Sequence, residues 1–192
     1  LVQITNNLIC DNWVDCGGGG VYVEDSIQIS GNTIRYNDAD GNVTGGGGGI
    51  MCGAGDGPTQ PLIMNNVVCK NTAGGYGGGI FCIQQAGANI VNNTVAENTV
   101  SLVGQNQSGG GICLRGSMTA NVVNTIVWNN SAGTGMGQEI ALAGSLSPVM
   151  NINFSDVPGN GPPSVYVATG ATFNWNAGGV AGMISSNPAF AN

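Results

Sequence analysis

The chain has 192 residues, of which 35 are glycine, 3 are Lys or Arg and 10 are Asp or Glu, and its formal net charge is −7 without any histidine. The absence of histidine excludes Ser-His-Asp and Cys-His catalysis and histidine-based zinc sites, and so few basic residues cannot hold a nucleic-acid backbone. Hydrophobic residues still make up 42% of the chain, which predicts one globular domain rather than a disordered segment. No stretch reaches the ~18 consecutive apolar residues of a membrane span.

Pairs of asparagines five residues apart recur along the chain, each with an apolar residue between its two members. The pairs are Asn7/Asn12, Asn32/Asn37, Asn66/Asn71, Asn93/Asn98 and Asn124/Asn129. Asn tolerates the left-handed backbone that tight turns need, and stacked amides can hydrogen-bond from one repeat to the next. We therefore predict a structural amide ladder formed by the first members of the pairs, Asn7, Asn32, Asn66, Asn93 and Asn124.

Glycine runs that end in a short apolar strand form a second repeat. The strands begin at Val21, Ile50, Ile80 and Ile112, with a weaker copy at Ile140, and the intervals are 29, 30, 32 and 28 residues. Alternation at period two in short segments bounded by glycine predicts strands and not helices. Three such strands per repeat describe one rung of a parallel β-solenoid, whose rungs stack about 4.8 Å apart.

The pattern I-x-x-N-x-I-x-x-N, a variable loop and G-G-G-I-x-V resembles the right-handed parallel β-helix repeats of pectate-lyase-like proteins. The segments at 155–159, 178–180 and 186–190 resemble the closing segment of bacterial secreted β-helix proteins, with Asn187 in place of the usual Asp. We therefore expect an all-β, right-handed parallel β-helix of about five to six rungs. Its repeats cover 1–145, and an irregular closing rung and cap covers 146–192 within the same domain.

In the family that the chain resembles, the strand after each glycine run faces the substrate. Alternation predicts that Tyr22, Met51, Phe81 and Cys113 point outward from this strand on successive rungs. Two interpretations stay open: the preceding loops cover this apolar row, or the row is an exposed interface for a partner subunit or a polymer. The row contains no carboxylate and no base, which argues against catalysis.

The resemblance also implies an alternative, a calcium-dependent polysaccharide lyase acting on an acidic glycan. Arg115 or Lys70 would then be the catalytic base. Neighbouring rungs could bring Asp15, Asp38 and Asp40 together, and hard oxygen ligands of this kind suit calcium. The competing interpretation of these carboxylates is a solvated acidic edge, and no other cofactor is expected.

A second alternative is a carbohydrate-binding module. Such a module would use Tyr22, Trp13 or Trp128 as platforms on which sugar rings stack, because aromatic side chains combine a flat apolar face with a polar edge. Trp13 opens the first loop, and Trp128 lies one residue before a predicted ladder asparagine. Packing of loops explains both tryptophans equally well.

The six cysteines permit disulfide bonds but do not require them. Cys52 and Cys82 are predicted to occupy the same inward site on adjacent rungs, with Cα atoms about 5 Å apart and within disulfide range, although the parallel side chains also suit stacked free thiols. Cys10 and Cys16 bracket a short loop and could close it. Structural cross-links are favoured over redox or zinc chemistry.

The sequence therefore favours a non-catalytic structural or adhesive protein outside the cell or on its surface, as a subunit or segment of a filament or stalk. Its charge is sparse, its predicted outward row is apolar, and its first strand would leave a sheet edge open. An open edge must be covered or must pair with another strand. We expect self-association or a longer parent chain to provide that strand, with a glycan as the alternative partner.

Overall fold

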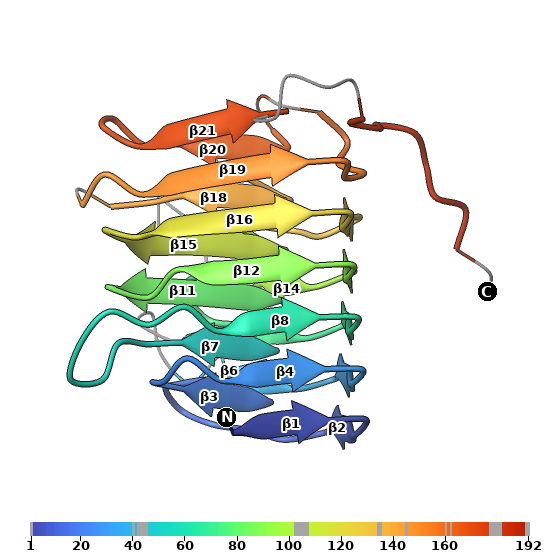
Figure 1. The fold of residues 1–192 in the computed structure, drawn as a ribbon. Helices are drawn as coiled ribbons and strands as arrows, with labels where there is room; N and C mark the ends of the chain where they lie inside the picture. The colour runs from blue at the N-terminus through green and yellow to red at the C-terminus, as the bar shows by residue number, and fades with distance from the viewer. Residues whose placement is uncertain are drawn as a thin grey trace.

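The computed structural model describes residues 2–39, 41, 46–101, 108–133, 136–144, 146–159, 161, 163–176 and 182–190. Within these residues the protein contains 21 short β-strands and no helix. All paired strands are parallel, and they stack into a solenoid that rises from the N-terminal to the C-terminal end (Figure 1). The all-β parallel solenoid that the repeats predict is thereby confirmed.

Sheet A contains seven strands and sheet D six. Sheet A consists, from the N-terminal end, of β1 (Gln3–Thr5), β4 (Gln28–Ser30), β8 (Leu62–Met64), β12 (Ala88–Val91), β16 (Thr119–Val123), β19 (Val149–Asn153) and β21 (Thr172–Trp175). Sheet D consists of β3 (Val21–Val23), β7 (Ile50–Cys52), β11 (Ile80–Gln84), β15 (Ile112–Gly116), β18 (Ile140–Leu142) and β20 (Val165–Val167). The strands β19, β20 and β21 lie beyond residue 145 and continue both sheets.

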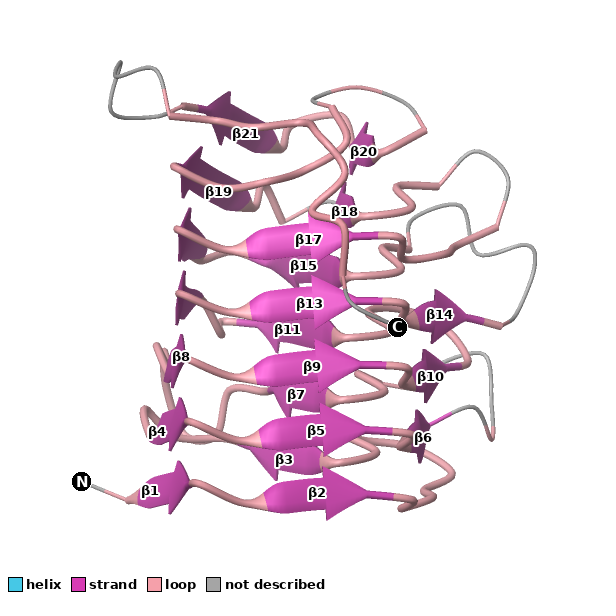
Figure 2. Cartoon of the chain, turned by 90° about the vertical axis from the view of Figure 1, so that its right-hand side faces the viewer, coloured by secondary structure: helices cyan, strands magenta, loops and turns pink. Residues whose placement is uncertain are grey.

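Two smaller sheets complete the wall of the solenoid (Figure 2). Sheet B consists of β2 (Leu8–Cys10), β5 (Thr33–Arg35), β9 (Val67–Cys69), β13 (Thr94–Ala96) and β17 (Ile126–Trp128). Sheet C consists of β6 (Asp38–Ala39), β10 (Thr72–Ala73) and β14 (Thr99–Val100). Above β17, single bridges through Asp156 and Ile184 extend sheet B, and the C-terminal segment then descends along this sheet.

Each short strand places its apolar residues inside the solenoid. Ile50, Ile80, Ile112 and Ile140 are register partners in sheet D and are at most 1% exposed. The central isoleucines and valines of sheets A and B belong to the same continuous core. At about 25 cal/mol per Å2 of buried apolar area, this core stabilises strands that are too short to form alone.

Two inner amide ladders run beside this core at the corners that flank sheet B. The first connects Asn7, Asn32, Asn66 and Asn93 and continues through Thr125 and Ser155. The second connects Asn12, Asn37, Asn71, Asn98 and Asn130. In both ladders a side-chain amide donates to the Oδ1 atom of the asparagine one level nearer the C-terminus. The prediction of amide stacking is confirmed.

The prediction that Asn124 belongs to the first ladder is wrong by one residue. Thr125 occupies the ladder position, and its Oγ1 atom accepts from the backbone amide of Asn93 at 3.3 Å. Asn124 instead adopts a left-handed backbone with φ of 49°, and its amide donates to Oδ1 of Asn92 at the exposed corner. The left-handed residue of each corner therefore precedes the ladder residue, and Asn130 rather than Asn129 continues the second ladder.

The last glycine of each run is required by the second ladder. A Cβ atom at Gly79 would lie 2.9 Å from Nδ2 of Asn98 and 2.8 Å from Cγ1 of Val95. Gly49 and Gly111 stand in the same relation to Asn71 and Asn130. The glycine runs thus bring a bare backbone against the amide ladder, which is why they recur before the same strand.

Glu139 replaces that glycine at the level of β18. Its Oε2 atom accepts hydrogen bonds from the backbone amide of Asn130 at 3.2 Å and from Nδ2 of Asn130 at 2.6 Å. The residue is 4% exposed, and this burial raises the pKa of its carboxyl group to about 7. A carboxylate thus ends the second ladder where its last amide needs an acceptor.

Burial of Glu139 predicts a pH-dependent stability. Because the pKa is raised in the folded protein, its contribution is fully present below the pKa of about 4.5 in the unfolded chain and is lost as the pH rises through about 7. We expect the free energy of unfolding to fall by about 2–3 kcal/mol between pH 4.5 and pH 8. In Glu139→Gln, which keeps the acceptor oxygen, this fall should largely disappear. Urea unfolding of both proteins across this range measures the difference, and equal pH profiles would contradict the assignment.

Candidate functional site

The outward row of sheet D has the predicted register, but it is covered along most of its length. Tyr22, Met51, Phe81 and Cys113 are successive register partners. Tyr22 is 49% exposed and Met51 is half-buried, whereas Phe81 and Cys113 are at most 1% exposed. The interpretation of this row as an exposed interface is therefore wrong at Phe81 and Cys113, and the alternative, a covering loop, applies there.

Tyr76, in the glycine-rich loop before β11, forms the cover. Its ring stacks on Phe81 with a centroid distance of 4.9 Å and an interplanar angle of 14°. The guanidinium group of Arg115 lies over the same Tyr76 ring, 4.6 Å from its centroid. Phe81, Tyr76 and Arg115 therefore form one stack on the outside of sheet D, with the cation at one end.

Arg115 lines a groove of about 700 Å3 on this face. Arg115 lies in β15, next to its register partner Ile83 in β11. The groove is lined by Ile83, Gln84, Arg115, Gly144, Leu146, Tyr166, Ala168 and Thr169. No acidic residue is among these described lining residues, so the positive charge of Arg115 is not compensated within the groove.

Tyr22, at the N-terminal end of the row, has a different environment. Its hydroxyl donates a hydrogen bond to Oε1 of Glu24, two residues along the chain. This bond, together with partial burial, raises the pKa of Tyr22 to about 12. The pair is three strands away from Arg115, so Glu24 and Arg115 do not form a joint site.

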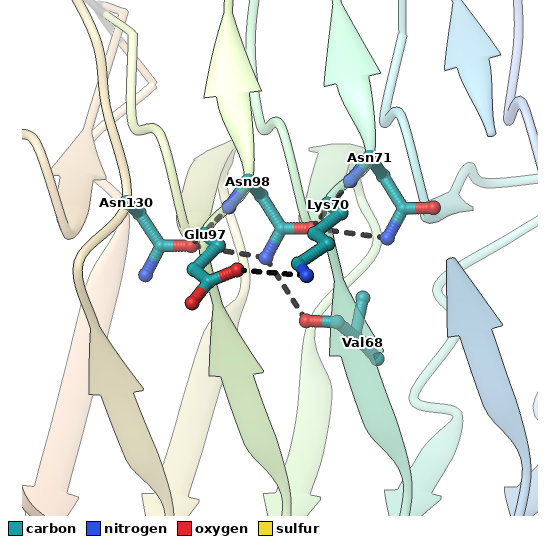
Figure 3. A network of polar contacts seen from close by, with 6 residues as sticks. All are labelled: Val68, Lys70, Asn71, Glu97, Asn98 and Asn130. Carbon is teal, nitrogen blue, oxygen red and sulfur yellow. Dashed lines mark hydrogen bonds and ion pairs between the residues drawn. The ribbon is translucent and has the colours of Figure 1, made fainter. Parts of the chain in front are cut away.

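Lys70, the other proposed base, lies at the corner beside the second ladder and not in the groove. Its Nζ atom is 3.4 Å from Oε2 of Glu97 (Figure 3). Both residues have a left-handed backbone, with φ of 57° and 58°, and the ladder residues Asn71 and Asn98 follow them directly. The Tyr36 hydroxyl and the Glu97 carboxylate raise the pKa of Lys70. Lys70 is thus a surface ion-pair partner, remote from Arg115 on sheet D.

The carboxylates proposed as calcium ligands are brought together only in part. Asp38 begins β6, and its carbonyl accepts from the backbone amide of Val14, next to Asp15. Asp40 lies outside the described residues. Among the described residues, including Asp15 and Asp38, no three Asp, Glu or Cys side chains gather closely enough to hold a metal ion.

All six cysteines are free thiols in the structure, so the predicted disulfides are not supported. Cys52 and Cys82 are register partners in adjacent strands, as predicted, but they form a pair of buried thiols. Their mutual hydrogen bond and their burial raise the pKa of Cys52 well above its usual value. Cys10 and Cys16 are likewise unbridged. Parallel neighbouring strands hold side chains side by side, which suits thiol packing better than a bond.

The three aromatic residues proposed as sugar platforms lie in different places. Trp13 is 66% exposed, and its backbone forms an isolated parallel β-bridge with that of Asp38 near the N-terminal end. Trp128 lies in sheet B, half-buried, where it shares a pocket with Asn187 and Phe190 of the C-terminal segment. Tyr22 lies in sheet D. The structure therefore does not combine them into one platform.

A third amide ladder, on the outer face of sheet A, was missed by the sequence analysis. The amides of Asn174, Asn151 and Asn121 each donate to the next asparagine toward the N-terminus, ending at Asn89, at 2.8–3.0 Å. The signal was present in the sequence, because three of these residues immediately precede a core isoleucine or valine of sheet A. This column is partly exposed, unlike the inner ladders.

Comparisons with family models, with curated proteins and with solved structures found no match for this chain. Within the described residues, no helix has the length and apolar character needed to cross a membrane.

Proposed function

We propose that this protein is a non-catalytic structural or adhesive solenoid, located outside the cell or on its surface, in which self-association or a longer parent chain provides a further strand for the N-terminal edge. The observation that carries the proposal is that three sheets end in an unpaired strand edge at the N-terminal end. β1, β2 and β3 are the terminal strands of sheets A, B and D, and each has a strand on one side only. Unpaired parallel edges of this kind are templates for another strand.

The same end also exposes apolar side chains and free ladder acceptors. Val2, Leu8 and Trp13 are 68%, 59% and 66% exposed. Asn7 and Asn12 donate to the next level, and no described donor reaches their own Oδ1 atoms. At the other end the last amide of the second ladder is satisfied by Glu139. The ladders therefore offer acceptors at the N-terminal end that a further rung or a second solenoid would fill.

The surface chemistry supports a role without catalysis. The two candidate bases lie apart, Lys70 at the corner after β9 and Arg115 in β15, and no acidic residue is among the described residues that line the groove. The repeat resembles right-handed β-helix proteins of the pectate-lyase-like class of bacterial secreted type, and we propose that relationship from the repeat residues alone. Filaments, stalks and adhesins all use such inert, elongated scaffolds.

A charge placed on the N-terminal edge tests the proposal. Leu8→Lys is expected to weaken self-association about tenfold or more, because lysine on an edge strand opposes pairing with another edge. Val67→Lys is the matched control, since Val67 lies in the same outward column two strands further in and is 42% exposed. Analytical ultracentrifugation of both variants and of the unchanged protein measures the effect. A protein that stays monomeric at all concentrations, or equal effects of both substitutions, would contradict the proposal.

A further inference from the structure

The groove at Arg115 is built differently from the rest of the surface. The chain contains only three basic residues. Lys70 is paired with Glu97, and Arg35 lies over the Tyr36 ring at an exposed corner. Lys70 lines a pocket together with Glu97, whereas the described residues that line the groove of Arg115 include no acidic side chain, and the recorded partner of its guanidinium is the Tyr76 ring. An uncompensated guanidinium in a groove attracts an anion.

The arginine is also positioned for recognition. Its guanidinium is held by stacking on Tyr76, which is itself held by stacking on Phe81. Cγ of Arg115 passes 3.1 Å from where a Cβ atom of Gly144 would lie, so that this glycine leaves room for the side chain. A guanidinium fixed in this way keeps its N–H groups available for a carboxylate, which it can bind through two parallel hydrogen bonds.

The remainder of the groove fits an apolar group next to an amide. Ile83, Leu146 and Ala168 supply an aliphatic surface, and Leu146 is 54% exposed. Gln84 and Thr169 supply an amide and a hydroxyl. Tyr166 is the one aromatic residue among the described lining residues beside these aliphatic ones, so the groove offers more contact to an aliphatic side chain than stacking surface to a sugar ring. The volume of about 700 Å3 is in the range of small-ligand sites.

We propose that this groove binds the C-terminal end of a polypeptide whose last residue is apolar. The terminal carboxylate would pair with Arg115, the apolar side chain would contact Ile83 and Leu146, and the preceding amide would hydrogen-bond with Gln84 or Thr169. The proposal is independent of assembly through the N-terminal edge, because the groove lies on the outer face of sheet D.

The test uses small probes and calorimetric or NMR titration of the folded protein. N-acetyl-leucine, a mimic of such a terminus, is expected to bind with a Kd of about 1 mM, as one charge pair and one apolar contact allow. N-acetyl-leucinamide, which lacks the charge, should bind at least tenfold more weakly. Hexanoate, which lacks the amide, and glucuronate, which lacks the apolar group, should also bind more weakly. No binding of N-acetyl-leucine at about 10 mM, or equal binding of any one of the other three, would overturn the proposal.

Two variants and a control locate the binding to the groove. Arg115→Gln should reduce the affinity for N-acetyl-leucine at least tenfold, while Lys70→Gln, with the same change in net charge, should leave it unchanged. Leu146→Asp changes an exposed residue and so keeps the fold, and it should weaken binding about fivefold by charge repulsion. Equal affinity in all three variants would overturn the assignment to this groove.

Discussion

Asn98→Ala is expected to lower the free energy of unfolding by about 3–5 kcal/mol, because it interrupts the second amide ladder at a fully buried position. Its Oδ1 atom accepts from the backbone amide and from Nδ2 of Asn71, and its own Nδ2 atom donates to Val68 and Asn130. Alanine would leave two donors without the Oδ1 acceptor and remove a donor from the Val68 carbonyl. The backbone amide of Asn71 would then be buried without its acceptor, and Nδ2 of Asn71 would keep only its bond to the Ile34 carbonyl.

Asn121→Ala is the matched control for this substitution. Asn121 also hydrogen-bonds to asparagines on both sides, Asn89 and Asn151, but it lies on the partly exposed outer face of sheet A. Because water can replace these bonds, we expect a loss of about 1 kcal/mol or less. Urea unfolding of both variants, monitored by circular dichroism, gives the two values. Similar losses would contradict the conclusion that burial of the inner ladder gives it its strength.

Gly79→Ala is expected to destabilise the protein by about 3 kcal/mol or more, because one added methyl group has no space. A Cβ atom at this position would lie 2.7 Å from the Gly111 carbonyl oxygen, 2.8 Å from Cγ1 of Val95 and 2.9 Å from Nδ2 of Asn98. The carbonyl belongs to the next strand connection and cannot move away without breaking the register of sheet D. The effect therefore reflects contact between levels and not the backbone freedom of glycine.

Gly57→Ala provides the comparison within the same chain. A Cβ atom at Gly57 would meet nothing within 4 Å, and this glycine has no left-handed backbone. We expect a change of about 0.5 kcal/mol or less in either direction. If Gly79→Ala were equally well tolerated, the close approach of the glycine run to the second ladder would be refuted.

The sequence was sufficient to predict the parallel solenoid and its register. Repetition every 28–32 residues places Ile50, Ile80 and Ile112 in one column, and the paired strands confirm it. The error at Asn124 arose because consecutive polar residues fill the corners. At both corners of this level the first of two consecutive polar residues has the left-handed backbone and the second joins the ladder, so Thr125 and Asn130 are the ladder residues and Asn124 and Asn129 are not.

The candidate site could be predicted only in part, because its cover comes from a loop. Alternation correctly placed Phe81 and Cys113 on the outer face of sheet D, but alternation carries no information on what lies above that face. Tyr76 reaches over Phe81 from the preceding loop and meets Arg115 of the next level. Such contacts depend on which residues of neighbouring levels lie close together in three dimensions. The repeat length and the alternation of residues along the sequence do not reveal them.

The direction of the inner ladders bears on how the protein is made. The Nδ2 atoms of Asn7 and Asn32 each donate to an earlier backbone carbonyl and also to an asparagine of the next level, which lies 25 residues later for Asn7 and 34 for Asn32. The ribosome therefore releases such an amide after its backbone acceptor and before its acceptor in the next level. The bond to the next level forms only when the following rung has been made, and the second ladder is complete only once Glu139 has emerged. The hydrogen bonds between levels can thus form in the order in which the rungs are synthesised, because the acceptor oxygen of each bond lies in the later rung.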